Sequence, residues 1–572
     1  MGTMLQAAGM KMGETPEVLN ITRPELLVSI AEQYYNAGSD VVYANTFGGN
    51  RYKLEECGHS VDELVTAGIK NAKKACANVN PRALVALDVG PIGQLLEPSG
   101  TMTFEEAYDI FKEQIIAGKS ADVIVFETMT DLYEVKAAVL AAKEQTNLPV
   151  MVSMTFEQGV SLTGSTPTIF AETMQNMGVD VVGTNCSLGP DQMLPVVQEL
   201  LGVCECPVMA EPNAGLPELH GTQTVFPLGP EGFAQKTAPF AHMGAQVLGG
   251  CCGTTPDHLA ALTQALHGLG GITAPKVERR GICLTSRSQL VRIGTGQPLA
   301  IIGERINPTG KKQLTLELQE GRFDTAMQFA DAQLEAGATV LDVNVGAPLV
   351  DETTLLPELV QRLVGRLTVP LSVDSPNAQA IANALPYCPG SFLVNSISGE
   401  AGRMEALGPL CRDFGAPFIL LPLQGAHLPE KAAERISTVE SLIERAEGMG
   451  ISRRLMMVDI LALAVSSSAD SALQCLEMTR WCAANGLPTT LGLSNLSFGL
   501  PARELLNSTF LSLAAGAGLT SCIANPSAQR LREAADALKV LCNHDAHASS
   551  FIASYSGWKP GEGTIQVRQG GG

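Results

Sequence analysis

The feature that most constrains the fold of this chain is an alternation of short apolar runs with longer segments of helical spacing, repeated along almost its whole length. The runs are rich in β-branched residues and bounded by Gly, Pro and Asn, whereas the segments between them carry apolar residues three and four positions apart. We expect each run to be a strand. The first half contains seven runs, at 40–45, 82–90, 123–128, 149–156, 179–185, 207–213 and 245–252.

The second half repeats this pattern and contains eight runs, at 299–305, 339–345, 370–375, 391–398, 416–422, 455–461, 489–494 and 520–526. Strands this apolar that alternate with helices predict parallel sheets buried on both faces, and eight such units close a barrel. The expected fold class is therefore α/β, with two (β/α)8 TIM barrels in tandem. Seven units in the first half also fit an open doubly wound sheet, but we expect a barrel with a truncated first strand.

The boundaries of these two domains follow from the composition between and after them. Residues 271–297 mix Pro, Gly and charge without sustained periodicity, which is typical of a linker or a hairpin. We therefore expect a first barrel at 1–272, a linker at 273–296 and a second barrel at 297–545. The Gly-rich, polar end of the chain predicts a flexible tail at 546–572.

Charge and hydropathy make several classes of partner unfavourable. The chain carries 38 Lys and Arg against 58 Asp and Glu, a formal net charge of −20, and no basic run offsets it, so we expect no nucleic-acid partner. We find neither a signal-peptide pattern nor an apolar window of about 18 residues, and so expect a cytoplasmic protein without membrane association. Most of the 14 cysteines are isolated in apolar or helical contexts, which favours reduced thiols or a metal over a disulfide framework.

Three cysteines lie at the ends of expected strands. Cys186 lies in GTNCSLGP, and Cys251 and Cys252 lie in GGCCGTTP. The carboxyl ends of barrel strands meet at one rim, so three thiolates could bind Zn2+ there and leave a fourth position open. The alternative is that they are small buried side chains, but vicinal cysteines flanked by glycines would pack poorly. Cys204 and Cys206, in GVCECP, precede their strand and face the opposite rim, so we expect a structural role for them.

These motifs, together with YANTFGGN, LDVGPIGQLLEPSG and FETMTDLYEV, resemble the homocysteine-binding domain of methionine synthases and of betaine- or methylmethionine-dependent homocysteine methyltransferases. The resemblance implies that Cys186, Cys251 and Cys252 are zinc ligands at a catalytic centre. It makes Glu127 a candidate for holding the amino group of homocysteine, and Asn213, in AEPNAG, is a second candidate on the same rim. The family usually has an Asp-Gly-Ala segment immediately before the sequence that begins here as MGTMLQ, which is why we expect the first strand to be short.

Polar residues recur at strand ends in the second half. Such a ring of donors and acceptors at one barrel mouth suits a flat heterocycle, although each residue taken alone could simply cap the following helix. The residues are Glu304, Asn307, Asp342, Asn344, Asp374, Asn395, Asp459 and Asn495.

This set, with GERINPTGKK and GLSNLSFGLP, resembles the pterin-binding domain shared by methionine synthases, corrinoid-protein methyltransferases and dihydropteroate synthases. The resemblance implies that Asn495 lies near the methyl-bearing nitrogen and assists its protonation, and we expect Arg503 at the folate tail. Where the family commonly has Asp-Pro-Leu, this chain has Asp459-Ile460-Leu461, which keeps the carboxylate. The residues expected to hold the pterin ring are Asp342, Asp374, Asn395 and Asp459.

Together the two resemblances imply a methyltransferase that moves a methyl group from 5-methyltetrahydrofolate, through a cobalamin carrier, to zinc-activated homocysteine. The corrinoid-binding motif Asp-x-His-x-x-Gly is approached only at Asp545 and His547, where Ser550 replaces the glycine. We therefore expect a separate corrinoid-binding domain or protein as partner. Two alternatives stay open: a corrinoid-linked thiol methyltransferase subunit with another methyl donor, and a non-catalytic folate- and zinc-binding subunit.

Overall fold

The computed structural model describes the chain except residues 12, 221–222, 274, 280, 426 and 558–572. Internal contacts divide the chain into two compact units. Unit 1 comprises Met1–Glu278, Thr285–Gln289 and Asp413–Gly415. Unit 2 comprises Arg279–Leu284, Leu290–Arg412 and Ala416–Gly572.

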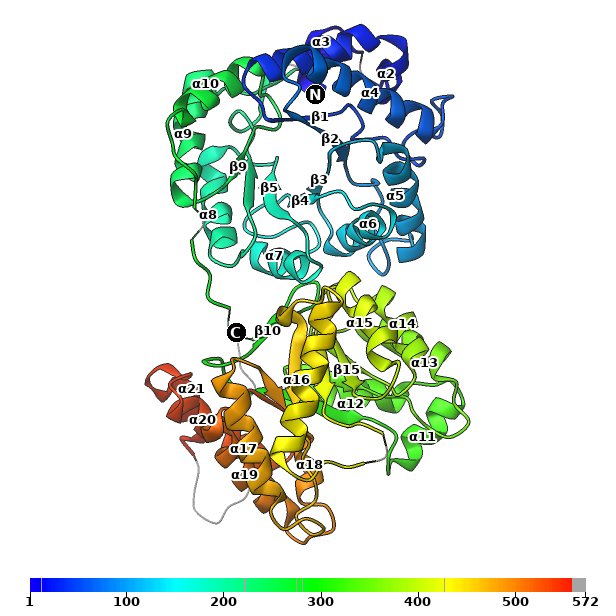
Figure 1. Cartoon of the computed structure of the whole chain (residues 1–572), viewed down its shortest axis with the longest axis vertical. Coiled ribbons are helices and arrows are strands. Elements are labelled where there is room, and N and C mark those ends of the chain that lie inside the picture. The colour runs from blue at the N-terminus through cyan, green and yellow to red at the C-terminus, as the bar shows by residue number, and fades with distance from the viewer. Residues whose placement is uncertain (12, 221–222, 274, 280, 426, 558–572) are drawn as a thin grey trace. The chain divides into compact units, whose positions relative to one another are not determined.

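Unit 1 is built on a parallel sheet of seven strands, one at each of the seven expected runs. The spatial order of the strands follows the chain, whereas a doubly wound sheet would reverse its order partway. The sheet curls with helices around its outside, as in a barrel (Figure 1). The strands are β1 (Val41–Tyr43), β2 (Leu84–Val89), β3 (Val123–Met129), β4 (Val150–Met154), β5 (Val181–Asn185), β6 (Val208–Glu211) and β9 (Val247–Leu248).

The helices of unit 1 begin with strong local signals. Ser60 and Glu63 form a capping box at the start of α4, and Thr103 and Glu106 form another at the start of α5. The principal helices are α3 (Pro24–Asn36), α4 (Val61–Val79), α5 (Phe104–Gly118), α6 (Leu132–Gln145), α7 (Pro167–Asn176), α8 (Pro190–Leu201), α9 (Pro230–Met243) and α10 (Pro256–Leu266). Shorter elements, which we did not expect, are α1 (Gly2–Ala7), α2 (Leu19–Thr22) and a hairpin of β7 (Glu218–His220) and β8 (Gln223–Val225).

Unit 2 contains all eight expected strands in one parallel sheet. Gly492, just after β18, forms an isolated parallel bridge with Ile523 in β19, so the two edge strands meet and the barrel is nearly closed. The expected (β/α)8 architecture is confirmed. The strands are β12 (Ala300–Ile306), β13 (Val340–Val343), β14 (Leu371–Asp374), β15 (Leu393–Ser398), β16 (Phe418–Leu421), β17 (Met456–Asp459), β18 (Thr489–Thr490) and β19 (Ser521–Ala524).

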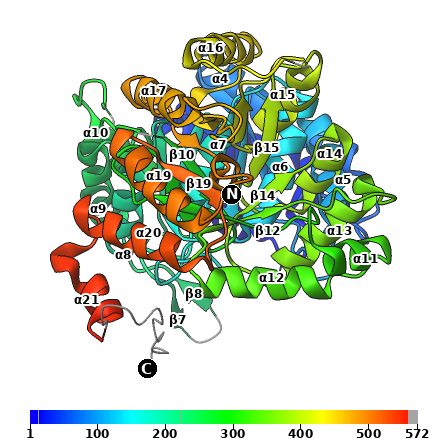
Figure 2. The same ribbon diagram turned by 90° about the horizontal axis from the view of Figure 1, so that it is seen from below.

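Helices surround the sheet of unit 2, as the view from below in Figure 2 shows. They are α11 (Lys312–Gln319), α12 (Asp324–Glu335), α13 (Glu352–Val364), α14 (Ala378–Ala384), α15 (Arg403–Asp413), α16 (Ala432–Gly448), α17 (Ser471–Ala484), α18 (Leu493–Leu496), α19 (Arg503–Ala517) and α20 (Gln529–Leu541). Within the segment expected as a flexible tail, residues 549–555 form α21 (Ser549–Tyr555), and residues 558–572 lie outside the described part of the chain.

The segment expected as a linker or hairpin forms two paired strands, β10 (Ile282–Thr285) and β11 (Leu290–Ile293). Their apolar side chains belong to the core of unit 2, because Ile282, Leu284 and Ile293 pack with Ile302 and Val340. The hairpin therefore contributes to the interior of that barrel rather than running free.

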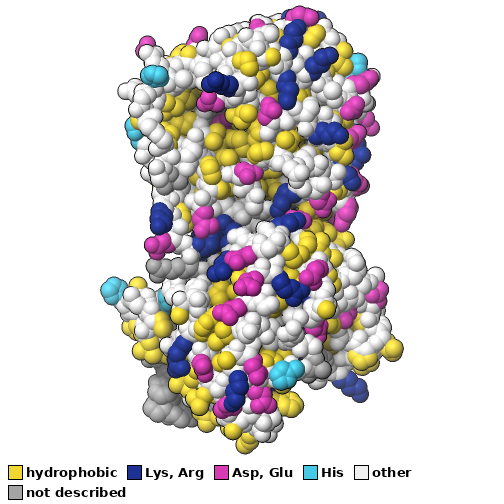
Figure 3. Space-filling model, viewed as in Figure 1, with side chains coloured by type: hydrophobic (Ala, Val, Ile, Leu, Met, Phe, Trp, Pro, Cys, Tyr) yellow, Lys and Arg dark blue, Asp and Glu magenta, His cyan; other side chains and the backbone are white. Residues whose placement is uncertain are grey.

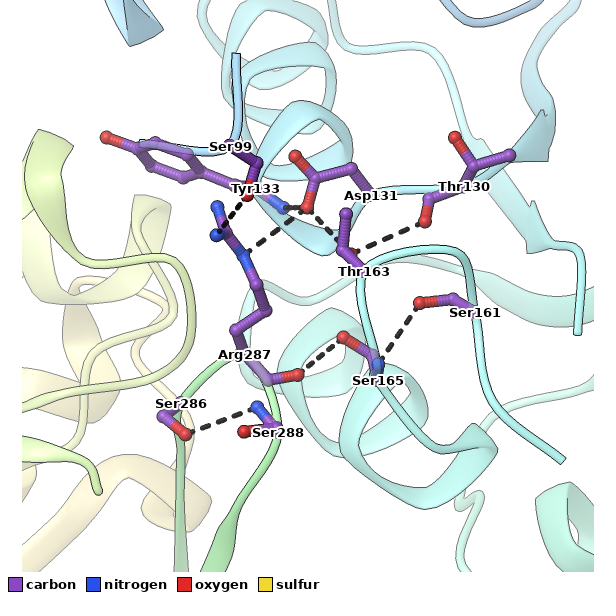
Figure 4. A network of polar contacts seen from close by, with 10 residues as sticks. All are labelled: Ser99, Thr130, Asp131, Tyr133, Ser161, Thr163, Ser165, Ser286, Arg287 and Ser288. Atoms are coloured by element: carbon purple, nitrogen blue, oxygen red, sulfur yellow. Dashed lines mark hydrogen bonds and ion pairs between the residues drawn. The ribbon is translucent and has the colours of Figure 1, made fainter. Parts of the chain in front are cut away.

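Residues 285–289 belong to unit 1, where Arg287 anchors them (Figure 4). Its Nη1 donates to Ser99 Oγ at 3.2 Å, and its Nε lies 3.6 Å from Asp131 Oδ1. Its backbone oxygen accepts from Ser165 Oγ at 2.6 Å. Because Thr163 Oγ1 also donates to Asp131 Oδ1, the loop after β4 is tied to the same carboxylate.

Acidic and basic side chains are mixed on the surface. On the face drawn in Figure 3, Lys and Arg side chains are scattered among Asp and Glu and form no continuous basic area. Of the helices that the structure describes, none combines the length and the apolar character needed to cross a membrane.

Candidate functional site

The three predicted cysteines of unit 1 come together in space. Cys186 directly follows β5, and Cys251 and Cys252 follow β9 after two glycines. Their sulfurs all lie within 4.8 Å of one another, and those of Cys186 and Cys252 are 3.7 Å apart. Within the described ranges, no other group of three or more His, Cys, Asp or Glu side chains is so arranged.

This spacing fits a tetrahedral metal. A Zn–S bond of about 2.3 Å places two sulfurs of one tetrahedron about 3.8 Å apart, close to the separation of Cys186 and Cys252. None of the three cysteines is fully buried, so a fourth ligand could reach the cluster from solvent. Three protein ligands with one accessible position are typical of a catalytic zinc site rather than a structural one.

The backbone after β6 supports both cysteine turns. The carbonyl of Glu211 accepts the N–H of Cys186 at 3.1 Å, and the carbonyl of Pro212 accepts the N–H of Cys251 at 2.9 Å. Asn213 Oδ1 accepts the N–H of Cys252 at 3.0 Å. Asn213, which the sequence predicts at this rim, is buried and contacts Cys252 directly.

Hydrogen bonding between the thiols sets which sulfur ionises first. The thiols of Cys251 and Cys252 hydrogen-bond the sulfur of Cys186 and lower the pKa of Cys186. The protein itself therefore stabilises one thiolate at this position. Cys204 and Cys206 precede β6 and take no part in the cluster.

A buried group of carboxylates lies beside the cysteines. Glu127, predicted from the sequence, accepts a hydrogen bond at Oε2 from Asn185 Nδ2 at 3.0 Å, and the same nitrogen lies 3.7 Å from Cys251 Sγ. Glu211 Oε1 accepts from the Tyr43 hydroxyl at 2.8 Å. Asn185 therefore links the carboxylate group to the sulfur group.

Burial dominates the electrostatics of these acids. It raises the pKa of Glu127 to about 7 and that of Glu211 to about 8, and mutual repulsion adds to the effect on Glu211. The pKa of Asp88 also lies well above its usual range, because of burial and the nearby Glu127. Sequence reasoning missed Asp88, Glu211 and Tyr43; the available signal was an acidic residue inside an otherwise apolar strand, in LDVG and AEPN.

Four predicted residues of unit 2 form one hydrogen-bonded group across neighbouring strands, joined by a hydrogen bond between the side chains of Asp342 and Asp374. Asp342 Oδ1 accepts from Ser372 Oγ at 2.7 Å and from Asn395 Nδ2 at 3.2 Å. Asp374 Oδ2 accepts from Asn344 Nδ2 at 2.9 Å. Burial raises the pKa of Asp342 well above its usual range, helped by repulsion from Asp374, and raises the pKa of Asp374 to about 6.

A second group forms around Glu304. Its Oε1 accepts from Ser494 Oγ at 2.8 Å, and Arg503 Nη2 donates to the Ser494 backbone oxygen at 2.6 Å. Burial raises the pKa of Glu304. Asn307 and Asn495 are less engaged: Asn307 Oδ1 accepts the N–H of Thr309 at 2.9 Å, and the exposed Asn495 side chain forms no hydrogen bond within the described residues.

Asp459 is the last residue of β17 and, among the described residues, shares no hydrogen bond with either group. Its Oδ1 accepts the N–H of Leu461 at 2.7 Å, and burial raises its pKa to about 6. The sequence left open that the polar strand-end residues simply cap the following helices. For α13 and α14 this is wrong, because the capping side chains are Asp351 and Asn377.

Comparisons with known proteins divide at the same place as the fold. Residues 1–266 match the family model of homocysteine S-methyltransferase, and residues 303–525 match that of pterin binding enzymes. The methionine synthases of Mycobacterium leprae and Mycobacterium tuberculosis are each 29% identical to this chain, over 567 and 564 residues. These matches cover 92% of this chain and 47% of each relative, so the chain spans about half the length of the curated relatives it matches.

Among solved structures, the oxidized form of the homocysteine methyltransferase MmuM of Escherichia coli is 21% identical, with a TM-score of 0.40 over 46% of this chain and 93% of that one. Dihydropteroate synthase of Xanthomonas albilineans is also 21% identical, with a TM-score of 0.36 over 45% of this chain and 98% of that one. On the two family matches, the chain carries a homocysteine S-methyltransferase domain followed by a pterin-binding domain.

Proposed function

We propose that this chain is the substrate-binding part of a methionine synthase. It would transfer a methyl group from 5-methyltetrahydrofolate, through a cobalamin carrier, to zinc-bound homocysteine, and release methionine and tetrahydrofolate. The observation that carries the proposal is the meeting of three cysteine sulfurs from two strand ends, spaced as a tetrahedral metal requires.

In this proposal Cys186, Cys251 and Cys252 would hold zinc. Zinc bound there would lower the pKa of the homocysteine thiol, which is otherwise largely protonated at neutral pH, and so supply a thiolate nucleophile. Three cysteine thiolates keep the centre negatively charged, which keeps a bound substrate sulfur electron-rich. The chain's own task is then to orient that sulfur.

The carboxylates beside the cysteines suit the amino group of homocysteine. Glu127, Asp88 and Glu211 are largely buried, and each has a raised pKa because of burial. An ammonium group placed among them would favour their ionised forms and be favoured by them. Asn185, which contacts both Glu127 and Cys251, would fix the distance between the amino group and the reacting sulfur.

In unit 2, the polar groups at the barrel mouth would hold the folate. Asp342, Asn344, Asp374, Asn395 and Asp459 would hydrogen-bond the pterin ring, with Glu304 and Asn307 beside it. Asn495 carries an amide that is exposed and unbonded to described residues, so it is available to the methyl-bearing nitrogen. Arg503 would meet the folate tail.

The cobalamin carrier belongs to another domain or protein in this proposal. The matched methionine synthases are about twice as long as the stretch that this chain covers. This leaves room in them for further domains. Homocysteine, 5-methyltetrahydrofolate and a corrinoid-bearing partner are therefore the proposed ligands of the chain.

The proposal is tested by zinc content and by methylation of homocysteine from free methylcobalamin. Cys251→Ser and Cys252→Ser should lose most of the bound zinc and the turnover, whereas Cys57→Ser, a partly buried cysteine of the same unit outside the cluster, should keep both. Turnover of Cys251→Ser at the wild-type rate would contradict the proposal. Zinc and folate binding by the wild type without methyl transfer would instead favour a binding subunit.

A further inference from the structure

We propose that Arg435 is a positioning residue of the pterin site: through one peptide group it holds Asp459 in place without occupying the carboxylate oxygen that the ligand needs. This inference rests on the proposed folate-binding role of unit 2. It adds a residue of α16 that lies outside the ring of polar strand ends and that no motif marks.

Arg435 is fully buried, with 0% of its surface exposed. Its Nε donates to the backbone oxygen of Pro429 at 3.0 Å, its Nη2 to that of Glu430 at 3.1 Å and its Nη1 to that of Ile460 at 3.0 Å. Nη1 also lies 3.6 Å from Cys475 Sγ. A buried cation is costly unless it is hydrogen-bonded and paired with an anion, yet among the described residues no carboxylate receives these hydrogen bonds.

The anion lies one peptide group away. The C=O of Ile460 and the N–H of Leu461 belong to the same peptide unit. Arg435 donates to its oxygen at 3.0 Å, and Asp459 Oδ1 accepts from its nitrogen at 2.7 Å. Guanidinium and carboxylate therefore hold opposite ends of one dipole, in the orientation in which each hydrogen bond strengthens the other.

The turn needs such support because its backbone is strained. Leu461 has a φ of 54°, in the left-handed region, which is unfavourable for a residue with a side chain. The N–H of Ile460 donates to the Thr490 backbone oxygen at 3.0 Å, which fixes the other side of the turn. Arg435 is thus one of the contacts that hold residues 459–461 in an otherwise unfavourable conformation.

The arrangement leaves Asp459 available to a ligand. A direct arginine–carboxylate pair is often bidentate and would occupy both oxygens. Here Oδ1 accepts the Leu461 N–H, and Oδ2 accepts no hydrogen bond from the described residues. Burial raises the pKa of Asp459 to about 6 and the charge of Arg435 opposes that rise, so the carboxylate can be ionised at neutral pH.

The test measures the Kd of 5-methyltetrahydrofolate for the whole chain by calorimetry, in a double-mutant cycle of Arg435→Lys and Asp459→Asn. Lysine keeps the charge but cannot span the three carbonyls, so Arg435→Lys should weaken binding about tenfold. In the Asp459→Asn background the same change should weaken binding less than about twofold, because the two residues act as one unit. Arg445→Lys, on the same helix but paired with Glu405 at 2.7 Å, is the matched control and should leave the Kd unchanged.

Equal losses from Arg435→Lys in both backgrounds, or no loss in either, overturn the inference. If Arg435→Lys does not fold, the change is made together with Leu461→Gly, since glycine adopts the left-handed conformation without strain. Recovery of a folded protein that binds 5-methyltetrahydrofolate then supports the inference, and continued unfolding overturns it. A wild-type chain that does not bind 5-methyltetrahydrofolate contradicts the proposed function itself, which is a distinct result.

Discussion

The side chain of Asn185 links several polar groups of unit 1, which no sequence motif indicated. Its side chain is fully buried; it donates to Glu127, to Thr128 Oγ1 and toward Cys251, and it accepts from the Thr128 N–H and from Ser153 Oγ. Removing one side chain would therefore leave several buried groups without partners, and each such group costs about 1–3 kcal/mol.

Asn185→Ala should accordingly lower the free energy of unfolding of unit 1 by about 2–4 kcal/mol. Chemical denaturation of the metal-free protein measures this change. Asn78→Ala, which removes only an exposed hydrogen bond to Glu32, should cost less than about 0.5 kcal/mol. A loss below about 1 kcal/mol for Asn185→Ala would show that water replaces its contacts.

Glu134 should make the free energy of unfolding depend on pH. It is 2% exposed, it accepts the Ile92 N–H at 2.7 Å, and burial raises its pKa from 4.5 to about 7. As pH rises from about 4.5 to about 7, the unfolded chain releases a proton that the folded chain retains. The free energy of unfolding should therefore fall with rising pH across this window.

Glu134→Gln keeps the acceptor oxygen but cannot ionise. Between pH 5 and pH 8 it should lose less stability than the wild type does, by about 2–3 kcal/mol. Chemical denaturation at several pH values measures the difference, and the other buried acids cancel because both proteins contain them. Glu105→Gln, at an exposed position, should show the same dependence of stability on pH as the wild type. If Glu134→Gln also shows the wild-type dependence, Glu134 is not the source of the effect.

Cys251 and Cys252 lie in the turn between β9 and α10, so the backbone of this turn sets the position of both sulfurs. Gly253, directly after Cys252, has a φ of 80°, and a Cβ there would overlap the ring of Phe226. Any side chain at this position must therefore move the turn or the ring.

Gly253→Ala should weaken zinc binding at least about tenfold and destabilise unit 1 by about 1–3 kcal/mol. Competition with a chelator of known affinity measures the first effect. Gly270→Ala, in an exposed segment where a Cβ meets nothing within 4 Å, should change neither quantity. Unchanged zinc affinity in Gly253→Ala would mean that the turn adapts without moving Cys252.

The repeating elements were predictable from sequence because burial on both faces makes each parallel strand an unbroken apolar run. Elements shaped by tertiary contact were not: α1, the β7–β8 hairpin and the four-residue α18 have no sustained period of their own. The same limit applies to the sites. The polar residues that recur at or near strand ends were found. Asp88 and Arg435 were missed, because a single acid in a strand or a single arginine in a helix shows its burial only through the partners that folding brings.

The whole molecule consists of two units with separate cores, and this predicts separate responses to ligands. Removing zinc should lower the unfolding temperature of one calorimetric transition. Adding 5-methyltetrahydrofolate at about 100 times its Kd should stabilise the other by about 2.7 kcal/mol, or roughly 5–10 °C. A single transition that both ligands shift equally would show that the units unfold as one.

Among the described residues, the hydrogen bonds that reach Asp342, Asp374 and Asp459 come from amide, hydroxyl and backbone N–H groups rather than from lysine or arginine. For inhibitor chemistry this sets a preference of charge. A heteroaromatic compound that carries a fixed positive ring charge could pair directly with these carboxylates, whereas an anionic isostere of the same shape would be repelled.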